Sequence, residues 1–177
     1  MIEIKDKKFI PFIDSDQLDE RVKELGSEIS RDFKGTQPVI IGVLNGAFMF
    51  LSDLSKSISI PVEISFVKIS SYEGENSTGS VKQLFGLEAD IENREVIIVE
   101  DIVDTGLSMS HLMGMIRDKK PKNIHIVTLL HKPEALQKEI TLDYIGFNIP
   151  NKFVVGYGLD YDGFGRNLAQ IYQLKTD

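Results

Sequence analysis

The sequence predicts an α/β fold with a twisted, mostly parallel β-sheet flanked by helices. Residues 96–99 are β-branched and apolar without interruption, which is typical of a strand covered on both faces, as strands of parallel sheets are. Strand-like runs then alternate with helix-like segments through the middle of the chain, the pattern of successive βαβ units. With 177 residues, the chain is long enough for one domain with a substantial core.

The first helix is expected after Asp14-Ser15-Asp16, because apolar residues then recur at intervals of three or four. These residues are Leu18, Val22, Leu25, Ile29 and Phe33. The other expected elements follow from apolar runs and the turn residues between them. In chain order they are strand 39–44, helix 47–58, strand 62–69, strand 96–99, helix 107–119, strand 124–130, a short helix after Pro133, and strands 142–147 and 153–157.

Residues 70–80 are almost all polar and turn-prone, with Tyr72 as the one aromatic residue. We expect this segment to form a long surface loop, and long loops in compact domains often act as lids over a site. The alternative is a disordered hairpin tip without a function.

The composition excludes several kinds of chemistry. The formal net charge of −7 argues against a nucleic-acid-binding surface and offers no polybasic patch for a membrane. The absence of cysteine excludes disulfides, thiolate metal sites and cysteine nucleophiles. The first residues lack the order of a signal peptide, and the longest apolar run, interrupted by Asn45, falls short of the ~20 residues that span a bilayer. We therefore expect a soluble, cytoplasmic protein.

An acidic segment that contains a glycine follows the strand at residues 96–99. It reads Glu100-Asp101-Ile102-Val103-Asp104-Thr105-Gly106-Leu107-Ser108. Ligands of parallel sheets gather at the carboxyl ends of the strands, and a strand-to-helix turn directs backbone N–H groups at an anion. Carboxylates suited to hydroxyl groups or Mg²⁺ are therefore expected beside N–H groups suited to phosphate. A phosphorylated sugar presents both kinds of group.

Two other phosphate-binding motifs are absent. No Gly-x-x-x-x-Gly-Lys-Ser/Thr sequence precedes the strand, so the acids after it do not belong to a Walker B strand. Gly156 and Gly158 begin like a dinucleotide fingerprint, but Tyr161 stands where the third glycine is required.

The segment 99–108 resembles the phosphoribosyl-pyrophosphate (PRPP) motif of the type I phosphoribosyltransferases. The resemblance implies the fold of that family as a single domain over all 177 residues. It also implies a small hood lobe from about residues 1–35 and 150–177, and lid residues at Ser71 and Tyr72.

The resemblance assigns roles to the residues of the motif. Glu100 and Asp101 would hold the ribose hydroxyls, directly or through Mg²⁺, so both are candidate metal ligands. Asp104 would face N7 of a purine as the catalytic base or proton partner. The residues implied in PRPP binding are Glu100, Asp101, Asp104, Thr105, Gly106, Leu107 and Ser108.

A second implied subsite is the turn that follows the strand at residues 39–44. From the residues alone, Asn45-Gly46 is a turn and nothing more. The resemblance implies that this loop binds pyrophosphate, often with a cis peptide at the bond that here joins Leu44 to Asn45. The family often has a basic residue in place of Asn45, so backbone N–H groups would make the contacts. Arg166 matches an arginine that meets pyrophosphate.

Residues 152–161 resemble the purine-binding segment of the hypoxanthine-guanine subgroup of the family. Phe153 would stack on the base and the Val154 carbonyl would accept a hydrogen bond from it. Asp160 would help to hold Mg²⁺ on pyrophosphate. Lys132, which ends another buried strand, would donate to the 6-oxo group of the purine.

The implied reaction is purine salvage, in which the phosphoribosyl group of PRPP moves to N9 of hypoxanthine or guanine to give IMP or GMP and pyrophosphate. The expected partners are PRPP, a 6-oxopurine base and other copies of the chain in a homodimer or homotetramer, without nucleic acid or membrane. One alternative is a regulator that binds PRPP or a nucleotide as a signal. Another is the same chemistry on a different base, such as xanthine, adenine or uracil.

Overall fold

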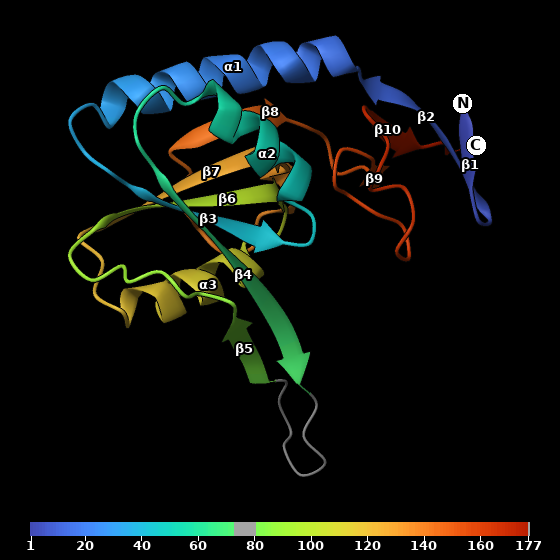
Figure 1. Cartoon of the computed structure of the whole chain (residues 1–177). Helices are drawn as coiled ribbons and strands as arrows, with labels where there is room; N and C mark the ends of the chain where they lie inside the picture. Colours follow the sequence, from blue (N-terminus) through green and yellow to red (C-terminus); the bar gives the residue numbers. More distant parts are fainter. Residues whose placement is uncertain (73–80, 177) are drawn as a thin grey trace.

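A six-stranded sheet forms the centre of the computed structural model, which describes residues 1–72 and 81–176 (Figure 1). The strand order is β5-β4-β3-β6-β7-β8. The strands are β3 (Val39–Leu44), β4 (Glu63–Tyr72), β5 (Val81–Phe85), β6 (Glu95–Val103), β7 (Asn123–His131) and β8 (Tyr144–Asn148). All neighbouring pairs from β4 to β8 are parallel and only β5 runs antiparallel, so the predicted mostly parallel sheet is confirmed.

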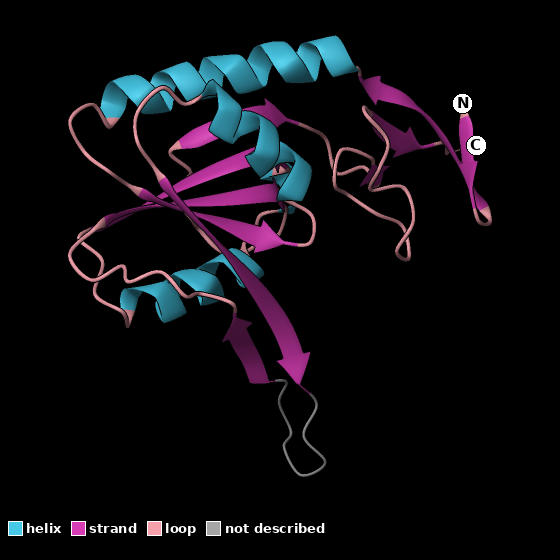
Figure 2. Cartoon of the chain, in the orientation of Figure 1, coloured by secondary structure: helices cyan, strands magenta, loops and turns pink. Residues whose placement is uncertain are grey.

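Helices cover both faces of this sheet (Figure 2). α1 (Ser15–Asp32) and α2 (Phe48–Ser57) lie on one face, over Ile97 and Val99 of β6, and α3 (Leu107–Arg117) lies on the other, over Val96 and Ile98. A short 3₁₀ helix (Pro133–Ala135) follows β7. None of the described helices is long and apolar enough to cross a membrane.

The start of α1 follows from its sequence. The Asp14 carboxylate accepts a hydrogen bond from the Gln17 N–H at 2.8 Å, and the Gln17 side chain accepts one from the Asp14 N–H at 3.1 Å. This reciprocal pair is a capping box, which satisfies two N–H groups that the helix itself leaves without partners. The predicted N-terminus of the first helix is therefore confirmed.

Two strands of the main sheet are longer than predicted. β6 continues to Val103 because β7 runs beside it, with Ile102 opposite Leu130 and Val103 opposite His131. β4 continues through the polar residues to Tyr72, because these pair antiparallel with β5, a strand that the sequence reasoning missed. The expectation of a loop from residue 70 onward was therefore wrong for its first residues, and residues 73–80 lie outside the described part of the chain.

A second, antiparallel sheet joins the two ends of the chain (Figure 1). Its order is β1-β2-β10-β9, formed by β1 (Ile2–Ile4), β2 (Lys7–Ile13), β10 (Ile171–Leu174) and β9 (Val154–Val155). The strand expected at residues 153–157 ends at Val155, because the backbone then turns with positive φ at Gly156. α1 lies in the segment assigned to the hood, yet its apolar face packs in the core of the main sheet.

α1 and α2 approach each other closely at Gly26. A Cβ atom added there would lie 2.5 Å from the Ser57 Cβ and 2.7 Å from the Ser57 carbonyl oxygen. Gly114 in α3 is also helical, but an added Cβ would meet nothing within 4 Å. Only the first glycine is therefore required for helix packing.

We predict opposite effects of Gly26→Ala and Gly114→Ala on the free energy of unfolding measured in urea. Alanine in a helix normally adds about 0.5–1 kcal/mol over glycine, and Gly114→Ala should show this gain. Gly26→Ala should instead lose about 1–3 kcal/mol, because the α2 backbone must move. A gain in both variants would contradict the packing described here.

Candidate active site

The carboxyl ends of β6 and β7 meet the segment around β9 at a cavity of about 270 Å³. The cavity is lined by Asp101, Ile102, Asp104, Lys132, Phe153, Val154, Leu159 and Asp160. Three stretches that are distant in the sequence therefore contribute to one space. It brings together the predicted lysine, the predicted aromatic residue and all of the predicted carboxylates except Glu100.

Glu100 and Asp101 form an acidic pair at this edge. Burial, reinforced by the neighbouring charge of Asp101, raises the pKa of Glu100 well above its ordinary value. Burial also raises the pKa of Asp101, although the positive charge of Arg166 opposes this shift. Two desolvated carboxylates side by side favour a proton or a cation between them. They can hold hydroxyl groups or a hard cation such as Mg²⁺.

The described residues contain no group of three or more acidic or histidine side chains arranged to hold a metal ion. Glu100, Asp101 and Asp160 thus do not form a closed cage by themselves. Mg²⁺ usually takes one or two carboxylates and completes its shell with water and phosphate oxygens, so the acidic pair alone has the ligand type that it uses.

The turn from Asp104 to α3 is fixed by its neighbours. Gly106 precedes the helix with φ of 76°, and a Cβ there would lie 2.7 Å from the Lys138 carbonyl oxygen. The Thr105 carbonyl accepts hydrogen bonds from the Gln137 and Lys138 N–H groups at 3.0 and 3.1 Å. A small second cavity adjoins this turn and is lined by Glu100, Ile102, Val103, Asp104, Gly106, Ser108 and Met109. The helix N-terminus opens toward it, so the turn is suited to an anion.

Lys132 lies directly after β7, with 9% of its surface exposed. Burial lowers the pKa of its ammonium group, and the nearby charge of Asp104 opposes that shift. Its backbone N–H donates to the Val103 carbonyl at 2.9 Å, which aligns the end of β7 with the end of β6. A poorly solvated ammonium group is well placed to donate to a carbonyl group in the cavity.

Phe153 is 43% exposed but is held by other side chains. Its ring centroid lies 6.2 Å from that of Phe9 and 5.8 Å from that of Tyr161, the latter in an edge-to-face contact. The Lys7 ammonium lies 5.5 Å from the Phe153 ring centroid. The aromatic ring is therefore fixed in place while much of it stays accessible for stacking.

The loop after β3 makes an unusually close approach to β6. A Cβ atom on Gly46 would lie 1.6 Å from an Asp101 carboxylate oxygen, so any larger residue would displace that carboxylate. A Cβ atom on Gly158 would lie 2.0 Å from the Gly46 carbonyl oxygen. The peptide bond from Leu44 to Asn45 is cis, as the resemblance implied. The predicted pyrophosphate loop is thus in contact with both the acidic pair and the predicted purine-binding segment.

Arg166 holds the purine-binding segment in shape. Its guanidinium donates to the Gly158 carbonyl at 2.7 Å and forms an ion pair with the Asp160 carboxylate at 2.7 Å. Two residues that were predicted to meet the same ligand therefore pair with each other in this structure.

Sequence reasoning missed two residues that line the cavity, Ile102 and Leu159. Each lies between predicted site residues, so its place within the motif could have identified it. The predicted lid residues, Ser71 and Tyr72, are the last residues of β4. Their side chains and residues 73–80 lie outside the part of the chain that the structure describes. The lid remains a prediction.

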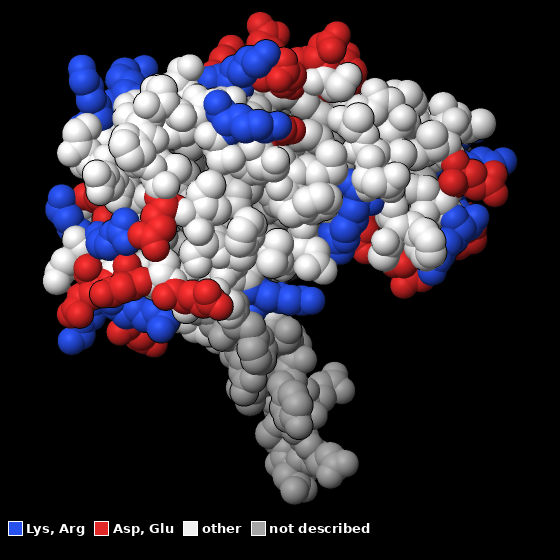
Figure 3. Space-filling view, in the orientation of Figure 1, with Lys and Arg blue, Asp and Glu red and all other residues white. Residues whose placement is uncertain are grey.

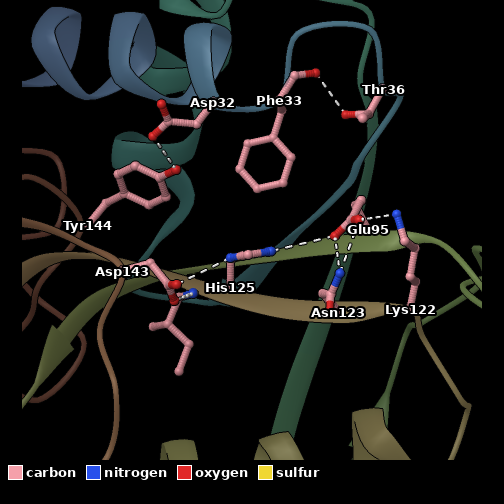
Figure 4. Close-up of polar contacts among 10 residues, drawn as sticks. Asp32, Phe33, Thr36, Glu95, Lys122, Asn123, His125, Asp143 and Tyr144 are labelled. Atoms are coloured by element: carbon pink, nitrogen blue, oxygen red, sulfur yellow. Dashed lines mark hydrogen bonds and ion pairs between the residues drawn. The ribbon is translucent and has the colours of Figure 1, made fainter.

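A separate polar network lies at the opposite, amino-terminal end of the parallel strands (Figure 4). The His125 ring lies between Asp143, at 3.2 Å, and Glu95, at 3.5 Å. Glu95 begins β6, whereas the predicted site is at the carboxyl end of that strand. This histidine therefore joins strands far from the cavity. On the face drawn in Figure 3, acidic and basic side chains are mixed instead of forming one basic area.

We predict that Gly158→Ala costs at least ~1 kcal/mol more folding free energy than Gly163→Ala. Both glycines have positive φ, 104° and 85°, so both variants are strained to a similar degree. Only at Gly158 would the new Cβ displace another backbone group, since nothing lies within 4 Å at Gly163. Urea unfolding of the two variants checks this, and equal losses would show that the loops are not in contact.

Comparisons with known proteins agree with this site. The family profile described as phosphoribosyl transferase domain matches residues 14–162. The hypoxanthine-guanine phosphoribosyltransferase of Bacillus subtilis (strain 168) is 44% identical over 164 residues, covering 92% of this chain and 91% of that protein. The bifunctional protein TilS/HprT of Listeria monocytogenes serotype 4b (strain F2365) is 44% identical over 93% of this chain, which spans only 26% of that protein. A crystal structure of a hypoxanthine phosphoribosyltransferase from Staphylococcus aureus has a TM-score of 0.87 at 38% identity, covering 97% of this chain and 93% of that one. The chain therefore belongs to the phosphoribosyl transferase family and has its type I fold.

Proposed function

We propose that the chain transfers the phosphoribosyl group of PRPP to N9 of hypoxanthine or guanine, giving IMP or GMP and pyrophosphate. The observation that carries this proposal is the single cavity in which Asp104, Lys132 and Phe153 meet. The names of the Bacillus subtilis and Staphylococcus aureus relatives support the same activity.

The base would lie in the cavity between Phe153 and Lys132. Phe153 would stack on the purine, and the Lys132 ammonium would donate to its 6-oxo group. Adenine has a 6-amino group there, which is itself a donor, so it would leave the buried ammonium without an acceptor. The Val154 carbonyl would accept from N1 or from a 2-amino group.

The sugar phosphate would lie along the end of β6 and the start of α3. Glu100 and Asp101 would bind the ribose hydroxyls, and the N–H groups from Thr105 to Ser108, including Gly106 and Leu107, would bind the 5′-phosphate. The support is the orientation of the α3 N-terminus toward the small cavity beside Asp104.

The pyrophosphate would lie over the loop of Asn45 and Gly46. Mg²⁺ bound by Glu100, Asp101 and Asp160 would neutralise charge on the leaving group. Arg166 would also face the pyrophosphate oxygens, which requires a change in its present ion pair with Asp160. Fixed positive groups aimed at developing charge commonly supply the largest catalytic contribution.

Asp104 would accept a hydrogen bond from N7 of the purine, or take its proton, so that N9 becomes the better nucleophile. Residues near Ser71 and Tyr72 would close over the sugar and exclude water. We also expect a cytoplasmic homodimer or homotetramer, following the family.

We predict that Asp104→Asn lowers turnover by about 10²–10⁴-fold while PRPP affinity stays within a few-fold of wild type. The reason is that the amide keeps the shape of the carboxylate but cannot take a proton. Nucleotide formation from hypoxanthine and PRPP with Mg²⁺ measures turnover, and calorimetry measures binding. Asp118→Asn, at the distant C-terminus of α3, is the control. Turnover near wild type in Asp104→Asn would refute the role of this residue.

A further inference from the structure

We propose that Tyr157 is a positioning residue that links the purine subsite to the pyrophosphate subsite through its hydrogen bond to Asp53. Neither residue lines the cavity. The names of the two subsites rest on the proposed function, but the link itself rests on the contacts described below.

The Tyr157 side chain is buried and directed away from the cavity, toward α2. Its side chain is 5% exposed, and its hydroxyl donates to the Asp53 carboxylate at 2.6 Å. Burial and this hydrogen bond raise the pKa of the Tyr157 hydroxyl, so it stays a donor at neutral pH. Burial raises the pKa of Asp53, but hydrogen bonds from Lys56 and Tyr157 outweigh it and lower that pKa below its ordinary value. The contact therefore joins a permanent donor to a charged acceptor, which is the stronger kind of hydrogen bond.

The backbone at Tyr157 needs such an anchor. Its φ is 50°, between φ of 101° at Gly156 and 104° at Gly158. Left-handed backbone is ordinary for glycine but is strained for a bulky residue. The surrounding structure must over-determine a conformation of this kind. The buried ring and the hydrogen bond to α2 do so here.

The strained turn sets the position of the residues on both sides of it. Val154 precedes it and Asp160 follows it, and both line the cavity. Gly158, at the turn itself, is packed against the Gly46 carbonyl oxygen. A small rotation at Tyr157 would therefore move the purine-binding residues and the contact with Gly46 together.

The other partner of the hydrogen bond lies in the helix that follows the pyrophosphate loop. Asp53 lies in α2, and the first turn of this helix follows directly on Asn45 and Gly46. The Leu51 N–H donates to the Ala47 carbonyl at 2.8 Å, so the loop leads into the helix without a flexible joint. The hydrogen bond thus ties the purine-binding turn to the same rigid helix that carries the pyrophosphate loop.

The chain contains a matched control for this contact. Tyr144 is also buried, at 9% exposed, and its hydroxyl donates to the Asp32 carboxylate of α1 at 2.9 Å (Figure 4). Tyr144→Phe therefore removes the same kind of hydrogen bond between a helix and the sheet, at a place away from the cavity. A purely structural role would make the two variants alike.

The test compares Tyr157→Phe with Tyr144→Phe in kcat and in KM for PRPP and for hypoxanthine. We expect Tyr157→Phe to lower kcat/KM for both substrates by about tenfold, and Tyr144→Phe to stay within about twofold of wild type. Asp53→Ala should lower kcat/KM as much as Tyr157→Phe does. The double variant should have a kcat/KM no lower than either single variant, because both changes remove the same hydrogen bond. Asp53→Asn should restore activity, because its amide oxygen still accepts the hydrogen bond. Equal kcat/KM in the two tyrosine variants, or additive losses in the double variant, would overturn the proposal.

Two further measurements test the proposal if Tyr157→Phe does not fold or if the proposed function is wrong. If Tyr157→Phe does not fold, Asp53→Ala and Asp53→Asn alone decide, since the Asp53 side chain is 40% exposed and substitutions at exposed positions usually change stability little. If the wild type forms no nucleotide, the proposed function fails, but the link can still be tested by calorimetric binding of PRPP and of GMP. Unchanged affinity for both ligands in Asp53→Ala would then refute the link.

Discussion

The close backbone approach at Gly46 is the constraint on which the rest of the site depends. A Cβ atom on Gly158 would meet the Gly46 carbonyl oxygen, and a Cβ atom on Gly46 would displace the Asp101 carboxylate. Because β3 and β6 are adjacent parallel strands, this contact fixes how the loop lies against the acidic segment. Gly158 lies between Val154 and Asp160, so the same contact places the purine-binding segment on the sheet edge. This one contact thus fixes the relative positions of three proposed subsites: the acidic segment, the pyrophosphate loop and the purine-binding segment.

The electrostatics of the site follow from its acids. Burial raises the pKa of both Glu100 and Asp101, and the neighbouring charge of Asp101 raises the pKa of Glu100 further. The chain as a whole carries a net charge of −7, yet the proposed substrate is strongly anionic. Under the proposed function, binding would use local positive groups: the N–H groups at the start of α3, Lys132, Arg166 and a metal ion between substrate and carboxylates. In this structure the charges of Arg166 and Asp160 compensate each other in an ion pair.

Much of this architecture was predictable from local sequence, because each main element packs through its own periodic apolar face. α1 is the clearest case, with its capping box and buried Leu18. The second sheet was not predictable in this way, because β2 pairs with β10 from the opposite end of the chain and no local pattern encodes that partner. The motifs predicted candidate site residues, and the cavity brings three of them, Asp104, Lys132 and Phe153, together. They could not give the contact of Gly46 with Asp101, which depends on how separate strands meet in space.

We infer that this cavity selects a 6-oxopurine as the acceptor of the phosphoribosyl group. This selectivity can be measured as the amount of nucleotide and of pyrophosphate formed by the wild-type protein from PRPP and Mg²⁺ with hypoxanthine, guanine, xanthine, adenine or uracil. We expect equal amounts of nucleotide and pyrophosphate with hypoxanthine or guanine, and little product with adenine or uracil. Efficient product from adenine would contradict the role of Lys132. No product from any base, with PRPP still bound, would contradict the transferase and favour a regulator that binds PRPP as a signal.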